Sequence, residues 1–382
     1  MKIGQFSDSF LPIYDGVGRV VYNYCETIGK KGHECYAIVP FADMGYRGNY
    51  PFEIVDFHSR ALPTMPQYRT GLPIFDTHYN ARLEMIDMDI VHLHSPFIAG
   101  MEAVRYAKKK NIPLVGTFHS KFHDDFMQIT GQEFLADMGV KRVVSLFNNC
   151  TEVWAVSETS AQTLKEYGFE KEIYVIPNGM NTRLISDEKI VKTRKQFNID
   201  DRPVLLFVGQ LNWKKNILRI LEACALLKKA SVSVQLILAG QGPHEKEIKE
   251  KINDLNIYDM TKMIGHIQDS DLLDGLYALS SLFVFPSLYD NAPMVVREAA
   301  NAKTPSVVVS FSNSAEVVIN NVNGLHCQDD SNDLFMVIKD ILNDPVKLKE
   351  LGLQAQKTIP IAWDKVIDQA LARYQYLIER YK

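Results

Sequence analysis

The sequence predicts an α/β protein built from two Rossmann-like domains with parallel sheets. Two observations carry this prediction: short apolar runs alternate with helical patterns along the chain, and this rhythm stops and restarts once near the middle. The runs are almost continuously apolar, which is typical of parallel strands that helices cover on both faces. At 382 residues the chain is also too long for one ordinary core and suits two domains.

The first series of apolar runs predicts the strands of an N-terminal domain over residues 1–185. These strands are expected at 2–7, 34–39, 90–94, 114–118, 152–156 and 173–176. After a polar, charged stretch at 182–202, a second series predicts a domain over 200–360, with strands at 204–208, 234–239, 262–264, 282–285 and 306–309. Helical periodicity then returns over 363–381 and predicts a last helix in segment 361–382, long enough to pack back on the N-terminal domain.

Composition excludes several classes of protein. A formal net charge of -4 and a pI near 6.2 argue against a general nucleic-acid binder, which needs a basic face. No apolar run approaches the ~20 residues that span a bilayer, and the strand-like start has no signal-peptide pattern before it. We therefore expect a cytoplasmic protein. The five cysteines are far apart and odd in number, and we interpret them as buried thiols.

We expect no metal site. His92 and His94 flank Leu93 at the end of an apolar strand, and the sequence offers no matching Cys/His cluster elsewhere. A structural role is the favoured interpretation of both rings.

In a doubly wound sheet, ligands bind at the carboxyl ends of the strands, so functional groups are expected among the residues that follow each strand. After the first strand, Gly16 and Gly18 open a helix, where backbone N–H groups can approach an anion. The spacing is not G-x-G-x-x-G and no acidic residue closes the second strand, so NAD binding is not supported. A plain strand-to-helix turn remains the alternative.

His119 lies just past the predicted strand 114–118. A polar ring there can donate a hydrogen bond to a hydroxyl or a phosphate oxygen, whereas a core histidine is the alternative. The nearby Asp124 and Asp125 fall in a helical stretch, and we interpret them as surface charges or as contacts to a second substrate.

Two loops of the C-terminal domain follow strands in the same way. Lys215, near a helix start in the loop that contains Gly209 and Gln210, is placed to neutralise a diphosphate, with a solvated lysine as the alternative. Gly240 lies in a similar strand-to-turn segment that we expect to shape a nucleobase pocket.

The fourth place is the loop and helix after strand 282–285. Asp290 is expected in the loop and Glu298 in the helix, with Pro293 in the first turn of that helix. Carboxylates accept paired hydrogen bonds from vicinal diols, so one can hold a ribose and the other a sugar. Acidic residues near a helix N-terminus are also favoured by the helix dipole alone, and this alternative stays open.

Taken in order, these segments make the chain resemble the family 4 glycosyltransferases, which are retaining enzymes of the two-Rossmann GT-B fold. The resemblance covers nearly the whole length. It rests on Gly16–Gly18, 117–119, 156–158, 176–179, Gly209 to Lys215, the acidic pair, 314–316 and 323–325. Such a fold implies an acceptor-side N-terminal domain, a nucleotide-sugar-binding C-terminal domain and a cleft between them.

The resemblance also implies residue roles. Lys215 binds the donor diphosphate, Glu298 the ribose hydroxyls, and Asp290, with its neighbour Asn291, the donor sugar. Backbone amides near Met294 and Val295 approach the phosphates, and His119 faces donor sugar and acceptor. The implied catalytic residues are His119, Asp290 and Lys215. No cofactor beyond the nucleotide sugar is implied, since Lys215, loop amides and a helix dipole can replace a metal ion.

Three positions depart from the family pattern. This chain has Asp290 where glutamate is usual, Gln210 where arginine is usual, and Pro293 where glycine is usual. Replacing arginine removes a fork of donors from a phosphate site, so weaker donor binding, another donor or a rebuilt loop is implied. A nucleotide-binding protein that has lost transfer activity is therefore one alternative, and a UDP-sugar epimerase of the same fold is another.

The expected reaction is transfer of a hexose from a nucleotide sugar, in first place a UDP-sugar, to a hydroxyl of a lipid or surface glycan. Residues 118–126 and 289–291 are similar to bacterial diacylglycerol glucosyltransferases, which implies peripheral contact with a membrane. A basic face of the N-terminal domain could contribute to such contact, although a solvated helix face is the stronger interpretation. Its members would be Arg105, Lys108, Lys109, Lys110, Lys121, Lys141 and Arg142.

Overall fold

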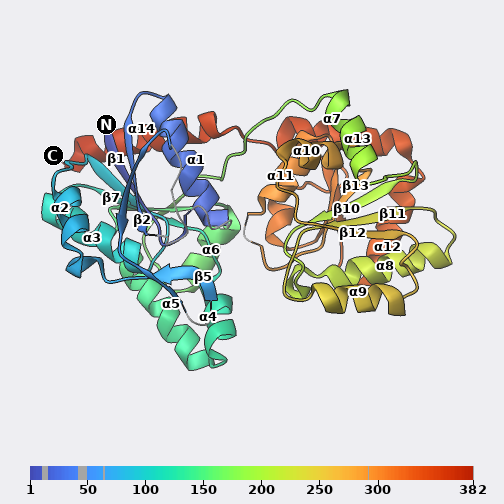
Figure 1. The fold of residues 1–382 in the computed structure, drawn as a ribbon, viewed down its shortest axis with the longest axis horizontal. Coiled ribbons are helices and arrows are strands. Elements are labelled where there is room, and N and C mark those ends of the chain that lie inside the picture. Colours follow the sequence, from blue (N-terminus) through green and yellow to red (C-terminus); the bar gives the residue numbers. More distant parts are fainter. Residues whose placement is uncertain (11–15, 42–49, 63–64, 291, 382) are drawn as a thin grey trace. The chain divides into compact units, whose positions relative to one another are not determined.

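The computed structural model describes residues 1–10, 16–41, 50–62, 65–290 and 292–381. Within these ranges the chain forms two compact units, shown in Figure 1. Unit 1 comprises Met1–Gly179 together with Ala362–Lys382, and unit 2 comprises Met180–Ile361. Each unit is a parallel sheet covered by helices, so the predicted fold class is confirmed.

Unit 1 contains a seven-stranded sheet in the order β3-β2-β1-β6-β7-β8-β9 and a separate two-stranded antiparallel sheet, β4-β5. Every pairing in the larger sheet is parallel. The strands are β1 (Lys2–Phe6), β2 (Glu34–Pro40), β3 (Glu53–Phe57), β4 (Arg60–Leu62), β5 (Met65–Thr70), β6 (Ile90–Leu93), β7 (Leu114–Phe118), β8 (Glu152–Ala155) and β9 (Ile173–Val175).

The helices of unit 1 include one from the far end of the chain. They are α1 (Gly16–Lys30), α2 (Thr77–Glu84), α3 (Ile98–Lys110), α4 (Phe122–Thr130), α5 (Glu133–Phe147), α6 (Glu158–Glu166) and α14 (Trp363–Tyr381), with a 3-10 turn at Pro73–Phe75. Helix α14 has the predicted bounds and packs beside α1 (Figure 1). Among the described helices, none combines the length and apolar character needed to cross a bilayer.

Unit 2 contains a six-stranded parallel sheet in the order β12-β11-β10-β13-β14-β15. Its strands are β10 (Val204–Val208), β11 (Gln235–Ala239), β12 (Thr261–Gly265), β13 (Leu282–Phe285), β14 (Ser306–Val309) and β15 (Gly324–Cys327). Its helices are α7 (Asp187–Gln196), α8 (Ile217–Lys229), α9 (Glu245–Asp254), α10 (Ser270–Leu279), α11 (Met294–Asn301), α12 (Ser331–Leu342) and α13 (Pro345–Thr358), with 3-10 turns at Trp213–Lys215 and Asn313–Glu316.

The continuous apolar runs in the sequence form buried strands, as predicted. Strands β6, β7, β8, β11, β13 and β14 are buried along their whole length, because helices lie on both faces of each sheet. The five cysteines are buried free thiols, as expected. The polar stretch at 182–202, predicted only as an interruption, contains helix α7, which packs against α10 within unit 2.

Candidate functional site

In each parallel sheet the chain first adds strands on one side of its first strand and then on the other side. Several candidate residues lie in the loops at this reversal. In unit 1 the chain runs outward from β1 to β2 and β3, then returns to place β6 on the other side of β1. In unit 2 the same reversal occurs between β10 and β13. Ligands of doubly wound sheets bind outside the carboxyl ends of the strands at such a reversal. These two places are therefore the candidate ligand sites.

In unit 1 the loops after β1 and β6 are tied together. The backbone N–H of Asp8 donates to Ser95 Oγ at 2.6 Å, and the Asp8 carboxylate accepts from Ser95 Oγ and from the backbone N–H of Ala99, both at 2.9 Å. Burial raises the pKa of Asp8 to about 6, although these hydrogen bonds act in the opposite direction. These three hydrogen bonds hold the loop after β1 against the loop after β6 and the start of α3.

His119 lies next to the loop after β6, where it contacts His94. It directly follows β7, and its Nε2 lies 3.0 Å from Nδ1 of His94, with the two rings stacked at a centroid distance of 5.3 Å. Burial lowers the pKa of His119 to about 3, so the ring is neutral at pH 7. A neutral ring next to the sheet reversal can exchange hydrogen bonds with a hydroxyl without carrying charge.

The two glycines predicted to approach an anion begin helix α1. Gly18 is buried, whereas a Cβ added at Gly16 would meet no described atom within 4 Å. Packing against the described residues therefore gives no steric reason for glycine at position 16. Residues 11–15, which precede the helix in the predicted anion loop, lie outside the described residues.

In unit 2 the loops after β10 and β13 meet through an ion pair. Lys215 Nζ lies 2.5 Å from Asp290 Oδ1, and only 15% and 21% of the two side chains are exposed. The Tyr289 ring faces both lysines of this loop, with Nζ of Lys214 at 4.9 Å and Nζ of Lys215 at 5.4 Å from its centroid. The structure thus brings together two of the predicted catalytic residues.

The second oxygen of Asp290 has a different environment. Its Oδ2 is buried and accepts no hydrogen bond from any described residue. Leaving a buried acceptor unsatisfied costs about 1–3 kcal/mol, so such an atom points to a donor that arrives with a ligand. A sugar hydroxyl is a donor of the required kind.

Glu298 lies in helix α11, one turn past its start, and is half-buried. Its Oε2 accepts a hydrogen bond of 3.0 Å from the hydroxyl of Tyr277 in α10. Tyr277 fixes one carboxylate oxygen of Glu298 and thereby orients the group.

The helix that carries Glu298 begins at Met294, so the backbone amides of Met294 and Val295, which the resemblance assigns to the phosphates, lie in its first turn. Pro293 occupies the N-cap position and not the first turn, and no described side chain caps this end. Uncapped N–H groups at a helix start attract an anion. Asn291, the remaining predicted donor contact, lies outside the described residues.

The glycines of the other two loops of unit 2 allow close backbone contact. Gly240 has φ +144°, and a Cβ there would come within 1.9 Å of the carbonyl oxygen of Gly209. The N–H of Gly209 in turn donates to the carbonyl of Ala239 at 3.0 Å. Gln210, the position where arginine is usual in the resemblance, is exposed at the edge of this contact.

Sequence reasoning missed two aromatic residues of the site. Tyr277 lies in the middle of a helical pattern and reads as an ordinary core residue, so only its contact with Glu298 reveals its role. Tyr289 directly precedes Asp290, and the signal available was its place in the same post-strand loop. Within the described part of the chain, no three His, Cys, Asp or Glu side chains gather closely enough to hold a metal ion.

Comparison with known proteins identifies the chemistry of this arrangement. The model of Glycosyltransferase Family 4 matches residues 14–184, and the model of Glycosyl transferases group 1 matches residues 189–358. The chain belongs to the family 4 glycosyltransferases. The predicted resemblance is confirmed, and the protein is an enzyme of the glycosyltransferase class.

Three relatives illustrate how this glycosyltransferase compares with others. It is 23% identical over 321 residues to an alpha-monoglucosyldiacylglycerol synthase of Acholeplasma laidlawii, a match covering 81% of this chain and 80% of that protein. It is 26% identical over 333 residues to a GDP-mannose-dependent alpha-mannosyltransferase of Corynebacterium glutamicum, covering 85% and 76%. The structure of Anabaena HepE in complex with UDP superposes with a TM-score of 0.80 at 20% identity, covering 99% and 100%, and shows the same fold.

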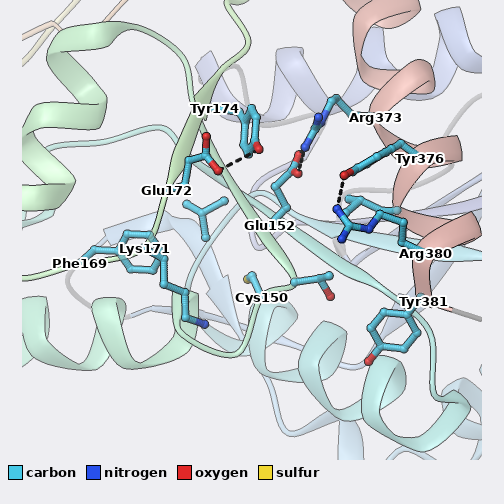
Figure 2. Close-up of a pocket in the computed structure, with 13 residues that line it drawn as sticks. Cys150, Glu152, Phe169, Lys171, Glu172, Tyr174, Arg373, Tyr376, Arg380 and Tyr381 are labelled. Carbon is cyan, nitrogen blue, oxygen red and sulfur yellow. Dashed lines mark hydrogen bonds and ion pairs between the residues drawn. The ribbon is translucent and has the colours of Figure 1, made fainter.

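This glycosyltransferase also has a pocket near the amino end of β8 in unit 1, with a volume of about 310 Å³ (Figure 2). Glu152, the first residue of β8, pairs there with Arg373 of α14 and accepts a 2.6 Å hydrogen bond from Trp154 Nε1. Arg373 also lies over the ring of Tyr174, at 4.0 Å from its centroid. Because the strands are parallel, the amino end of β8 faces away from His119, and these contacts fasten the last helix to the sheet.

Proposed function

We propose that this glycosyltransferase transfers a hexose from a UDP-sugar to a hydroxyl of a lipid or surface glycan, with retention at the anomeric carbon and without a metal ion. The observation that carries the proposal is the Lys215–Asp290 pair at the reversal of the unit 2 sheet, with the unsatisfied Oδ2 of Asp290 beside it. The alternatives, a binding protein without transfer activity and an epimerase, are not favoured by the relatives, since the three described above are named as transferases or synthases or bind UDP.

In this proposal unit 2 binds the donor. Lys215 and the uncapped amides of Met294 and Val295 neutralise the diphosphate, which would otherwise need a cation as it departs. Glu298, oriented by Tyr277, accepts hydrogen bonds from the two ribose hydroxyls. The turns at Gly209, Gln210 and Gly240 border the nucleotide.

Asp290 has two tasks in the donor site. In the described structure its Oδ1 holds Lys215, and its Oδ2 is available to a hydroxyl of the sugar. Aspartate is one methylene shorter than the glutamate usual at this position, and the direct pair with Lys215 is a contact that this shorter side chain makes. The pair prevents Lys215 from being an uncompensated charge before the donor binds.

Unit 1 supplies the acceptor side. His119 contacts the reacting sugar and the acceptor, and the backbone amides of Gly16 and Gly18 at the start of α1 contact a phosphate of the donor. A phosphate oxygen of the leaving nucleotide takes the proton of the acceptor hydroxyl. The match of an alpha-monoglucosyldiacylglycerol synthase over 81% of the chain supports a lipid hydroxyl as the acceptor.

Peripheral contact with a membrane is a further part of the proposal, and we propose other residues for it than those expected from the sequence. The α3 part of the predicted basic face is occupied by partners: Arg105 contacts Glu102, Lys109 contacts Glu84, and Lys110 contacts Asp87. Lys108 donates to the Asn149 side chain. These four residues therefore offer little charge to a lipid surface.

Helix α5 is the better candidate for this surface. Phe134 and Met138 are 72% and 52% exposed and lie one turn apart on the same side of the helix, followed by exposed Lys141 and Arg142. Exposed apolar side chains beside basic ones are the pattern of a helix that inserts at an anionic interface. In co-sedimentation with phosphatidylglycerol vesicles, we expect Phe134→Ser/Met138→Ser to lower the bound fraction severalfold. Leu184→Ser, which removes a still more exposed apolar side chain in unit 2, should leave the bound fraction unchanged. Equal loss in both variants would contradict this assignment.

The donor assignment is tested with a panel of UDP-glucose, UDP-galactose, UDP-N-acetylglucosamine and GDP-mannose. Thermal unfolding, nucleotide release and product formation are measured with and without diacylglycerol in mixed micelles. We expect a UDP-sugar to raise the unfolding temperature and to be consumed faster with the acceptor present. His119→Ala and Glu298→Ala should abolish transfer. Neither binding nor slow hydrolysis of any donor would refute the proposal, and preference for GDP-mannose would replace the donor.

A further inference from the structure

Beneath His119, buried polar side chains of unit 1 form one continuous series of hydrogen bonds. They come from β1, β6, β7, the residues that directly follow β6 and β7, and the C-terminal helix α14, and five of the six are buried. Buried polar groups in such numbers are rare and have to satisfy one another. The series consists of His119, His94, Gln5, Tyr374, His92 and Thr117.

The distances define the order of the contacts. His119 Nε2 lies 3.0 Å from His94 Nδ1, and His94 Nε2 lies 2.6 Å from Gln5 Oε1. Gln5 Nε2 donates to the Tyr374 hydroxyl at 3.5 Å. That hydroxyl lies 2.5 Å from Nδ1 of His92, and Nε2 of His92 lies 2.6 Å from Thr117 Oγ1.

Gln5 gives this series a direction, because the two ends of an amide are not equivalent. Its carbonyl oxygen only accepts, so His94 must donate to it from Nε2. A neutral imidazole carries one N–H, and burial keeps the pKa of His94 well below its ordinary value. Nδ1 of His94 is therefore an acceptor, and His119 must carry its proton on Nε2.

The other half of the series agrees with this direction. The amide nitrogen of Gln5 donates to the Tyr374 oxygen, so the phenol proton is directed to Nδ1 of His92. His92 then donates from Nε2 to Thr117. The four groups between His119 and Thr117 each give one hydrogen bond along the series and receive one.

We propose that Gln5 is a positioning residue that fixes the tautomer of His119, so that Nε2–H points inward to His94 and Nδ1 is held as a hydrogen-bond acceptor. Sequence reasoning treated His119 as a donor to hydroxyl or phosphate oxygens. With Nδ1 as the acceptor, this ring selects for a partner that donates, such as a sugar hydroxyl, and disfavours a bare phosphate oxygen. Only this last step rests on the proposed function.

The test reads the tautomer directly. The protein is labelled with 15N-histidine, and long-range proton–nitrogen NMR spectra are recorded at pH 7.5 without nucleotide sugar. The His119 ring is assigned by its absence in His119→Gln. We expect the wild-type ring to be protonated on Nε2. A ring protonated on Nδ1, or a mixture of both tautomers, would overturn the proposal without the need for any further variant.

Two substitutions separate the role of Gln5 from general packing. Gln5→Glu places a carboxylate against His94, which favours a doubly protonated His94 that donates to His119 and moves the His119 proton to Nδ1. Tyr374→Phe leaves the contact between Gln5 and His94 in place, so His119 should keep its Nε2 proton although the fold is less stable.

The rate of sugar transfer provides a second measurement. If the proposed transfer reaction holds, Gln5→Glu should lower kcat by about 10-fold or more, because the Nδ1–H of His119 then faces the sugar hydroxyl in place of an acceptor nitrogen. An unchanged tautomer in Gln5→Glu would refute the role of Gln5. A changed tautomer in a protein that transfers no sugar would leave the role of Gln5 intact and refute the proposed function alone.

Discussion

At the scale of single residues, the two lysines of the loop after β10 differ in a way that can be tested. Lys215 is largely buried against Asp290, whereas Lys214 is exposed and lies against the face of the Tyr289 ring. If Lys215 neutralises the diphosphate, Lys215→Ala should lower kcat/KM for the nucleotide sugar by about 10- to 100-fold, the value of a charge-assisted contact.

The control is Lys214→Ala, which removes the same charge one residue earlier. Its kcat/KM should stay within about 2-fold of wild type, as expected for an exposed group. Equal losses in the two variants would mean that the loop acts through its net charge and that Lys215 has no special position.

Residues that work through distant partners are the ones that sequence reasoning could not find. Lys215, Asp290 and Glu298 were predicted because each follows a strand at the position where ligands bind. Tyr277 and Gln5 act through Glu298 and His94, and nothing in the local pattern of a helix or an apolar strand shows such contacts. A polar glutamine within the apolar run of β1 was the one available signal.

At the scale of elements, the contact between the loops after β10 and β11 depends on Gly240. Its φ of +144° is accessible only to glycine, and a Cβ would overlap the carbonyl of Gly209. Gly240→Ala should therefore lower the free energy of unfolding of unit 2 by roughly 3 kcal/mol or more and weaken nucleotide binding. Urea unfolding followed by the fluorescence of Trp213, which lies in unit 2, measures this.

Gly265 provides the matched control. It also has a positive φ, +72°, but a Cβ there would meet nothing within 4 Å. Gly265→Ala should cost only about 1 kcal/mol, the conformational part alone. If both variants lose the same stability, glycine is needed at position 240 only because it tolerates a positive φ, and not because the two loops approach closely.

The elements themselves were predicted with uneven success, for physical reasons. Buried central strands such as β7 and β13 have the predicted bounds, because a continuous apolar run leaves little choice. Strands β3 and β15 were missed. Both lie at sheet edges, and their sequences mix apolar with charged or polar residues, since an edge strand is only partly covered.

At the scale of the whole molecule, unit 1 should respond to acid through its buried histidines. Burial lowers the pKa of His92 and His94 well below the ordinary 6.5 and that of His119 to about 3. The unfolded chain binds these three protons below pH 6.5 while the folded unit does not, so stability falls as the pH falls. Asp8 acts in the opposite sense: its pKa is raised to about 6, so the folded unit binds a proton there before the unfolded chain does.

Near pH 5 these four groups leave the unfolded chain with about two more bound protons, a loss of roughly 2.7 kcal/mol per pH unit. Asp8→Asn should make the slope steeper by about 1.4 kcal/mol per pH unit. Urea unfolding in a Trp213→Phe background measures this, because the remaining Trp154 and Trp363 are both buried in unit 1. Stability that is flat between pH 7 and 5 would show that the three rings accept protons in the folded state.

Helix α14 belongs to unit 1 although it is the last segment of the chain, and this has a consequence for synthesis on the ribosome. Tyr374 and Arg373 complete contacts that start at β1, β6 and β8, yet about 200 residues separate them from Gly179. At ordinary rates of translation, roughly 10–40 s pass before they emerge. Unit 2, which is continuous in sequence, therefore completes its core first, and the half of the protein made earliest is finished last.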